Sequence, residues 1–259
     1  LPAVAVNFSF VLFVSFYSKY AVDVLLVAPA AIGLIFGAGR LFDAVLDPIL
    51  GVWSDRTQHA WGRRRPWMAA SMVPMAVVGW MVWSPPAFLE GWQLTAWVAV
   101  AVFAFNIVIT LFLIPHQALG AELTTDSHEV SRVFAWRQAA TYVGMIGCLV
   151  VGMPALMRSS EPRSLATTYA LVCGAVILVT VAISVALLRE PGGNRRRGGH
   201  AGRNVARDLW RNRYSRRLFS MIFIEYVGSG ASMVVAPFLI QYVLKLPDRT
   251  GDVFIFYVG

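Results

Sequence analysis

The sequence has few charged residues. Its 259 residues include only 22 Lys and Arg and 14 Asp and Glu, or 14% of the chain, whereas soluble domains ordinarily have about 25%. A surface that faces water needs many more charged side chains than these. Because 58% of the residues are hydrophobic and the mean hydropathy is +0.63, the composition excludes an ordinary soluble enzyme and predicts a membrane protein.

Cysteine and histidine are also scarce. Cys148 and Cys173 lie in separate apolar runs without CxxC spacing, and the four histidines show no metal-ligand spacing. The sequence therefore indicates neither a disulfide framework nor a zinc site. It also lacks the phosphate-binding pattern GxxxxGK(S/T), which argues against ATP as an energy source. Since no nucleophile and base pattern is present either, we expect no enzyme activity and no cofactor.

Seven long apolar runs predict transmembrane helices, because about 20 apolar helical residues cross the core of a bilayer. The predicted helices are Pro2–Val27, Ala30–Ser54, Trp67–Trp83, Trp92–Ile114, Val133–Met157, Thr167–Leu188 and Leu218–Tyr242. An eighth run begins near Asp252, and the sequence stops inside it. The chain also begins without Met. We therefore expect an all-α membrane protein and a chain that is part of a longer one.

The basic residues predict the orientation in the membrane. Sixteen of the 22 lie in the connections after the second, fourth and sixth predicted helices. Since positive residues collect on the cytoplasmic side, these connections and the N-terminus are predicted to be cytoplasmic. Topology thus accounts for the formal net charge of +8, and we expect no nucleic-acid partner.

The connection after the sixth helix divides the chain. Residues 1–188 are predicted to form a six-helix transmembrane bundle, residues 189–217 a basic cytoplasmic loop, and residues 218–259 the start of a second bundle. The first half of the loop is rich in Gly, Asn and Arg, a composition typical of disorder. Its second half, Ala206–Leu218, is expected to form a basic helix on anionic lipid.

Three ionisable residues fall within eight residues of the second predicted helix. Arg40, Asp43 and Asp47 are spaced by three and four residues, so they share one helical face. Each charge costs about 2.5 to 3.5 kcal/mol at the centre of a bilayer, and this face must therefore meet a polar cavity or partners. Pairing of Arg40 with Asp43 is one interpretation. It leaves a second carboxylate, and two carboxylates one turn apart can hold Na⁺ or share a proton.

Two short motifs follow that helix. The first is Gly51-Val-Trp-Ser-Asp55-Arg56, and the second is Trp61-Gly-Arg63-Arg64-Arg65-Pro66. They resemble the signature loop between the second and third helices of the major facilitator superfamily. With the preceding Asp-x3-Asp-Pro, the stretch resembles the glycoside-pentoside-hexuronide:cation symporters, the melibiose permease family. The resemblance implies a twelve-helix transporter in two six-helix bundles, of which this chain has the first bundle, the central loop and the start of the second.

The resemblance also implies a coupling site. Asp43 and Asp47 match the cation-binding carboxylates of that family, Thr110 matches its hydroxyl ligand, and Arg40 matches an arginine one turn before the first aspartate. Leu46 replaces an asparagine that tunes the choice of cation in the family. This replacement weakens the case for Na⁺ and leaves coupling to H⁺ open. Asp43 and Asp47 would be a metal site only for Na⁺, if the protein is not coupled to H⁺.

Fewer of the family's solute-binding residues than of its cation-binding residues are matched in this sequence. With a one-residue gap, Arg137 matches an arginine that contacts sugar in that family. Asn7 and Leu113 replace two acidic residues that hold a galactoside, and Gln117 replaces a sugar-contacting tryptophan. Asn7 can still bind a hydroxyl group, but a galactoside is not expected. Tyr17 is a further candidate for lining the substrate cavity, with anchoring at the membrane interface as the alternative.

Charged residues near the second and fourth connections indicate a gate. Glu122, Asp126 and Glu129 are expected to share a helical face, with Arg132 one turn on. Ion pairs to the basic loop would close the cytoplasmic side and break when the bundles move, whereas a solvated charged turn is the alternative. The candidate gating residues are Asp55, Arg56, Arg63, Arg64, Arg65, Glu122 and Asp126.

We thus expect a monomeric symporter in the inner or plasma membrane that couples a sugar or glycoside-like solute to Na⁺ or H⁺. Its partners would be this small solute and membrane lipid. Two alternatives stay open. One is symport of a lysolipid or another non-sugar solute, which the loss of the acidic sugar contacts permits. The other is a non-transporting membrane module, in which the intramembrane acids are paired and inert.

Overall fold

The computed structural model describes residues 2–123, 126–188 and 211–218, together with single positions between 220 and 243. The described part is helical and contains no strand. Its helices are α1 (Pro2–Asp23), α2 (Pro29–Arg56), α3 (Arg65–Trp83), α4 (Gly91–Glu122), α5 (Ser127–Gly147), the π-helix η1 (Cys148–Gly152), α6 (Met153–Arg158) and α7 (Pro162–Leu187).

Six segments are long and apolar enough to cross a membrane. They are α1, α2, α3, α4, the run from α5 through η1 to α6, and α7. The first six predicted transmembrane helices are thereby confirmed. The seventh, Leu218–Tyr242, lies mostly outside the described residues, and so do residues 189–210 and the start of the eighth. Of the expected surface helix Ala206–Leu218, residues 213–218 are described and are helical.

Two helix boundaries differ most from the prediction, each by more than five residues. α4 continues through Pro115 to Glu122, whereas the apolar run ends at Ile114. α5 begins at Ser127, six residues before Val133. Both differences arise because the helices extend beyond the hydrocarbon-like part of the sequence, which a search for apolar runs does not detect. As a result, Arg132 and Arg137 lie within α5 and not in a connection.

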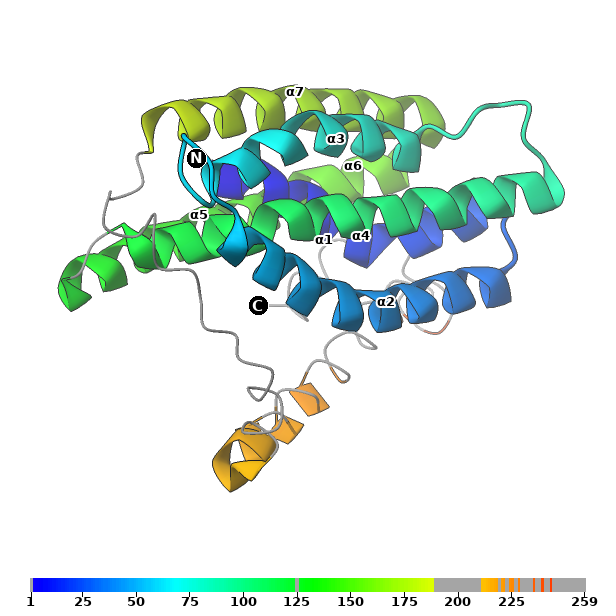
Figure 1. Cartoon of the computed structure of the whole chain (residues 1–259). Coiled ribbons are helices and arrows are strands. Elements are labelled where there is room, and N and C mark those ends of the chain that lie inside the picture. Colours follow the sequence, from blue (N-terminus) through cyan, green and yellow to red (C-terminus); the bar gives the residue numbers. More distant parts are fainter. Residues whose placement is uncertain are drawn as a thin grey trace.

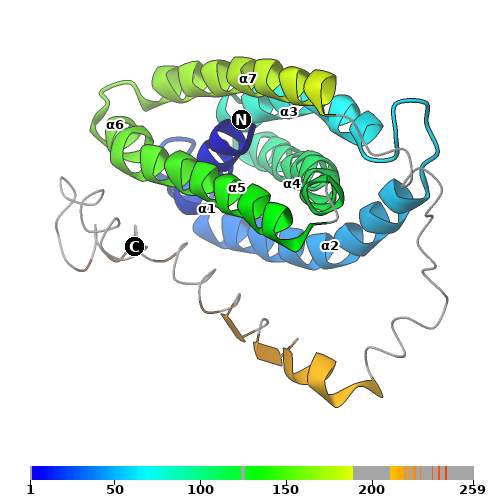
Figure 2. The same ribbon diagram turned by 90° about the vertical axis from the view of Figure 1, so that its left-hand side faces the viewer.

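The helices form one bundle. Figures 1 and 2 show α3 and α7 side by side along one side of it, with α2 on the opposite side. Helix α1 lies inside the bundle and contacts α2, α5, η1 and α7. Most of its side chains are buried, including those of Val6, Tyr17 and Tyr20. This central helix carries two of the predicted solute residues, Asn7 and Tyr17.

Small residues let the fifth span approach α1 closely. A Cβ atom at Gly144 would lie 2.2 Å from the carbonyl oxygen of Val4, and one at Gly152 would lie 2.7 Å from the ring of Phe8. Gly144 is thus packed against the α1 backbone. The π-helical turn Cys148–Gly152 interrupts the α-helical repeat beside Phe8. Such turns often occur at functional sites, and this one separates Arg137 in α5 from Arg158 in α6.

Candidate transport site and its charged loop

The three ionisable residues of α2 are brought together as the sequence predicts. Nη1 of Arg40 lies 3.8 Å from Oδ2 of Asp43, and the Arg40 side chain is 58% exposed. This separation is longer than a hydrogen bond, so the ion pair is loose. Oδ1 of Asp43 is buried and has no hydrogen-bond partner in the described part of the chain. Asp43 thus has an unused acceptor beside its arginine.

The second carboxylate on this face has no cation partner among the residues that the structure describes. Asp47 is exposed, and no ion pair joins it to a residue that the structure describes. With one arginine and two aspartates, this face of α2 carries a net negative charge. The pairing of Arg40 with Asp43 therefore occurs, as one interpretation of the sequence proposed, but it neutralises only one of the two acids.

A hydroxyl on α4 lies level with the first carboxylate. Gly39 of α2 packs against Asn106 of α4, where an added Cβ would lie 3.0 Å from Nδ2 of Asn106. The two helices run in the same direction (Figure 1). Asp43 and the buried Thr110 each follow this contact by four residues, so they lie at the same level of the two helices. The backbone therefore places the carboxylate and the hydroxyl on neighbouring helices at equal depth.

The arginine-rich loop is tied to the end of α4. Nη2 of Arg63 donates to Oε1 of Glu122 at 2.6 Å, and Nη2 of Arg64 donates to the same oxygen at 3.2 Å. Arg64 also pairs with Asp55 and donates to Oγ of Ser54 at 2.5 Å. Both arginines are buried. Four of the predicted gating residues therefore form one network, which we call the loop network: Asp55, Arg63, Arg64 and Glu122.

The third arginine of the loop binds a different helix. Nε of Arg65 donates to the carbonyl oxygen of Val185 at 3.0 Å, and Nη2 donates to the same oxygen. Carbonyl groups in the last turn of a helix have no partner within that helix. Arg65 therefore connects the start of α3 to the end of α7. The sequence motif gave no signal for this contact or for Ser54, because neither partner is a charged residue.

The predicted shared face of Glu122, Asp126 and Glu129 is wrong. α4 ends at Glu122, and Asp126 is the N-cap of α5, where its Oδ1 accepts a hydrogen bond from the backbone N–H of His128 at 2.9 Å. Glu129 belongs to the first turn of α5. The break between the helices separates Glu122 from the other two acids. Arg56 is exposed at the end of α2 and lies outside the loop network.

A cavity of about 430 Å³ lies between α4 and α5 near this end of the bundle. We call it the inner cavity. Its lining includes the predicted solute residue Arg137. Its other charged or aromatic lining residues are His116, Glu129, Arg132 and Trp136, and the remainder are Ala3, Leu119, Gly120, Leu123, Val133, Ala140 and Leu188.

Two further candidates lie beside the inner cavity. Nδ2 of Asn7 donates to the carbonyl oxygen of Ala3 at 2.8 Å and to Oγ1 of Thr141 at 3.4 Å. Thr141 follows Arg137 by one turn of α5, and its hydroxyl donates to the Arg137 carbonyl at 3.0 Å. Gln117 is exposed and directly follows His116 of the lining. The structure therefore brings Asn7 and Arg137 to one region, whereas Gln117 is not among the lining residues of the inner cavity.

Tyr17 is placed elsewhere. Its side chain is only 1% exposed and packs among aromatic rings, with ring centroids 5.3 Å from Phe13 and 5.2 Å from Trp83. It is not among the lining residues of the inner cavity. In this structure the residue belongs to the core, and we leave it out of the proposed solute site.

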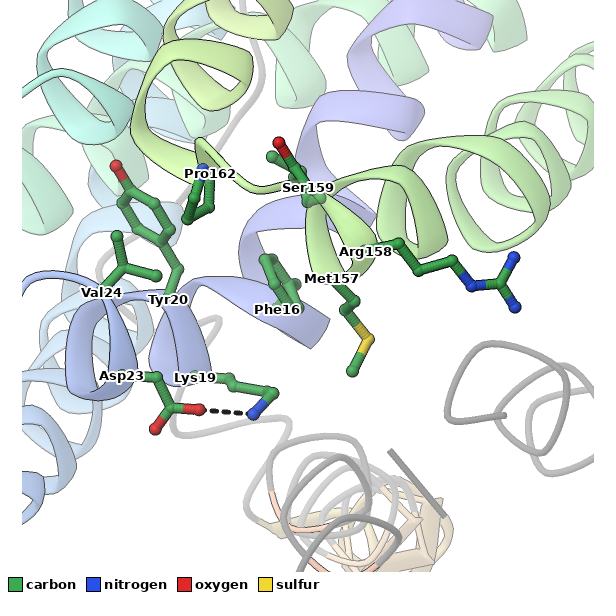
Figure 3. A pocket seen from close by; sticks show the side chains of 10 residues that line it. Phe16, Lys19, Tyr20, Asp23, Val24, Met157, Arg158, Ser159 and Pro162 are labelled. Atoms are coloured by element: carbon green, nitrogen blue, oxygen red, sulfur yellow. Dashed lines mark hydrogen bonds and ion pairs between the residues drawn. The ribbon is translucent and has the colours of Figure 1, made fainter. Parts of the chain in front are cut away.

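A second cavity of about 460 Å³, the outer cavity, lies at the opposite end of α1, where α6 meets α7. Figure 3 shows Lys19 and Asp23 of α1 on one side and Arg158, Ser159 and Pro162 on the other. Nζ of Lys19 donates to Oδ2 of Asp23 at 2.5 Å. The sequence gave no signal for this cavity beyond the charges themselves.

This chain is similar in sequence to known membrane transporters. Residues 1–258 match the family described as MFS/sugar transport protein. An uncharacterised symporter of Synechocystis is 34% identical over 58% of this chain and 28% of its own length. A sodium-dependent lysophosphatidylcholine symporter of zebrafish is 31% identical over 53% of this chain and 26% of its own.

A sugar transporter is also among the relatives. The isoprimeverose transporter of Lactiplantibacillus pentosus is 26% identical over 59% of this chain and 31% of its own length. In each case the match spans less than a third of the relative. The family match nevertheless covers nearly the whole chain, and it confirms the resemblance that the α2 and loop motifs indicated. The chain belongs to the MFS/sugar transport protein family, whose members are multi-pass membrane transporters and not enzymes.

Proposed function

We propose that the complete gene product is a secondary symporter, which moves a sugar or glycoside-like solute together with Na⁺ or H⁺. The observation that carries the proposal is the charge of the α2 face. Among the described residues, Arg40 alone forms an ion pair on this face, which holds both Asp43 and Asp47. The level position of Thr110 adds a hydroxyl oxygen to the same site. Oxygen ligands of this kind suit Na⁺, and two nearby carboxylates can also hold one proton.

The mechanism follows from the charge balance. A cation bound by Asp43 and Asp47 would neutralise the α2 face and lower the cost of placing that face against a second bundle. The solute would bind between the bundles near Asn7, Gln117 and Arg137. The two ligands would then favour the same orientation of the bundles, which is the physical basis of coupled transport. No covalent step and no tightly bound cofactor takes part.

Membrane orientation and organisation belong to the same proposal. The protein lies in the inner or plasma membrane with its N-terminus in the cytoplasm, since the arginines of the α2–α3 loop and the Arg-rich residues 189–217 would then face the cytoplasm. Residues 1–188 form the first bundle, residues 189–217 the central loop, and residues 218–259 begin the second bundle. The functional unit is a monomer that contacts membrane lipid.

Uptake into proteoliposomes tests the proposal. The complete gene product is reconstituted, and uptake of labelled isoprimeverose, methyl β-D-glucuronide and lysophosphatidylcholine is measured with an inward Na⁺ gradient, an inward H⁺ gradient, or neither. We expect at least one probe to accumulate above its external concentration under one gradient only. Equal uptake of every probe with and without both gradients would contradict coupled transport.

A lysophospholipid is the second candidate solute. Asn7 and Leu113 replace the acidic residues with which the family holds a galactoside, and a relative of this chain is named as a lysophosphatidylcholine symporter. The same uptake experiment separates the candidates. If isoprimeverose and methyl glucuronide fail to compete with lysophosphatidylcholine, the sugar assignment is wrong and the lipid assignment stands.

A further inference from the structure

The outer cavity lies where three membrane-spanning segments end. α1 ends at Asp23, the fifth span ends at Arg158, and α7 begins at Pro162. All three residues line the cavity. The ends of membrane-spanning helices lie at the headgroup layer of a bilayer. The cavity, with its volume of about 460 Å³, is therefore at the level of the phospholipid headgroups.

The charged lining residues lie at this level and have a net positive charge. Lys19 and Arg158 are cationic, and Asp23 is the one acid of the lining. Nζ of Lys19 donates to Oδ2 of Asp23 at 2.5 Å, and Lys19 is only 6% exposed. Arg158 is exposed and stands at the edge of the group (Figure 3). The pair of Lys19 and Asp23 is neutral, so the charge of Arg158 is the excess.

A hydroxyl group stands beside Arg158. Oγ of Ser159 accepts a hydrogen bond from the backbone N–H of Glu161 at 3.1 Å, and its own O–H is a further donor. Glu161 and Arg163 flank Pro162 outside the lining, and their opposite charges leave the excess unchanged. Ammonium, guanidinium and hydroxyl groups all donate to phosphate oxygens. The mouth of the cavity therefore suits a phosphate.

The deeper part of the lining is apolar. Phe16 lies seven residues before Asp23, or about 10 Å further along α1, and Leu156 and Met157 directly precede Arg158. Phe16 and Leu156 are both buried. A ligand that matches the whole lining is thus anionic at one end and apolar at the other. A free anion would match only the mouth.

We propose that the outer cavity binds an anionic phospholipid of the surrounding bilayer. Its phosphate lies against Lys19, Arg158 and Ser159, and the start of its acyl chains lies against the apolar lining. The bound lipid connects α1 to the fifth span and to α7. It is not the transported solute, because the outer cavity lies at the opposite end of α1 from the inner cavity.

Native mass spectrometry of the complete gene product, purified in detergent and stripped of lipid, tests the proposal. The dissociation constant of the first bound lipid is measured for dioleoyl phosphatidylglycerol and for dioleoyl phosphatidylcholine, which has the same chains and no net charge. Glycerol 3-phosphate has the phosphate but no chains and is measured in parallel. We expect phosphatidylglycerol to bind about fivefold or more tightly than phosphatidylcholine, and glycerol 3-phosphate not to bind detectably.

Substitutions of the lining should change this preference in opposite directions. Arg158→Gln removes the excess charge and should reduce the preference to within about twofold, whereas Arg158→Lys should keep part of it. Asp23→Asn removes the one acid of the lining and should increase the preference. Arg56→Gln, at an exposed position at the other end of the bundle, is the charge-matched control and should leave the preference unchanged.

The proposal is wrong if the two lipids bind equally, or if Arg56→Gln lowers the preference as much as Arg158→Gln does. It is also wrong if the preference survives Arg158→Gln, or fails to rise in Asp23→Asn, in protein that elutes like the wild type. Tight binding of glycerol 3-phosphate would assign the cavity to a soluble anion and not to a lipid. None of these results bears on the symport proposal, which the uptake experiment tests separately.

Discussion

Oε1 of Glu122 accepts hydrogen bonds from two different arginines, Arg63 at 2.6 Å and Arg64 at 3.2 Å. Together with Asp55, which pairs with Arg64, this carboxylate at the end of α4 balances the two buried guanidinium charges of the α2–α3 loop. All of these groups belong to residues 54–65 and 122, so the contact holds one bundle together. Movement of the bundle as a rigid body would leave it intact.

Substitution of Glu122 tests the structural role of the loop network. In Glu122→Gln, two buried guanidinium groups lose their shared counter-charge, and breaking a buried ion pair in this way costs about 3 to 5 kcal/mol. We expect a clearly lower midpoint in thermal unfolding, followed by tryptophan fluorescence in detergent. Glu129→Gln, which changes an exposed acid of α5, should differ from the wild type by about 0.5 kcal/mol or less. Equal midpoints for the two variants would refute the network.

The close approach of α5 to α1 depends on Gly144. In Gly144→Ala the new methyl group would collide with the Val4 carbonyl oxygen, and relief of such overpacking typically costs about 1 to 3 kcal/mol. Gly37→Ala is the matched control, because nothing lies within 4 Å of its Cβ position and alanine favours a helix by up to about 1 kcal/mol. The unfolding midpoint should fall for the first variant and stay or rise for the second. The reverse order would contradict this packing.

Arg65 should protect the end of α7 from local opening. Arg65→Ala removes the donors to the Val185 carbonyl, and hydrogen bonds to charged groups contribute about 1.5 to 3 kcal/mol. Hydrogen–deuterium exchange followed by mass spectrometry should show faster exchange near residues 183–188 in this variant. Arg56→Ala, at an exposed position on the same side of the bundle, serves as the control. Unchanged exchange in Arg65→Ala would show that the contact is not formed in solution.

Tyr17 should act as a core residue. Replacement of a fully buried large aromatic side chain by alanine costs about 3 to 5 kcal/mol, so Tyr17→Ala should unfold at a much lower temperature. Tyr17→Phe keeps the ring that packs on Phe13 and Trp83. We expect it to retain the wild-type KM for the transported probe. A several-fold higher KM in Tyr17→Phe would show that the Tyr17 hydroxyl contacts the solute, and it would contradict the core assignment.

The sequence was sufficient for the six spans and for the α2 charges, because both depend on local signals. Apolar runs mark the spans, and the spacing of Arg40, Asp43 and Asp47 places them on one face in any α-helix. The loop motif likewise identified the arginines that meet Glu122. The break at Asp126 was missed because one apolar-to-polar transition can continue a helix or end it, and only the N-cap geometry decides.

Contacts in which at least one partner is an uncharged group far along the chain could not be predicted. The contact of Arg65 with a backbone carbonyl and the contact of Gly39 with Asn106 depend on how whole helices pack. The types of the residues involved do not indicate which partner each one meets. Tyr17 shows the opposite problem. An aromatic residue on the central helix can face either a cavity or the core. Only the packed bundle shows that Tyr17 contacts Phe13 and Trp83 and therefore belongs to the core.

The central claim is that Asp43 and Asp47 couple the cation to the solute. The most direct test measures two activities of Asp47→Asn in proteoliposomes: gradient-driven accumulation, and counterflow exchange without a gradient. We predict that accumulation falls to the equilibrium level while counterflow persists, and that Asp43→Asn behaves alike. If Asp47→Asn still concentrates the probe under the same Na⁺ or H⁺ gradient as the wild type, the coupling site lies elsewhere.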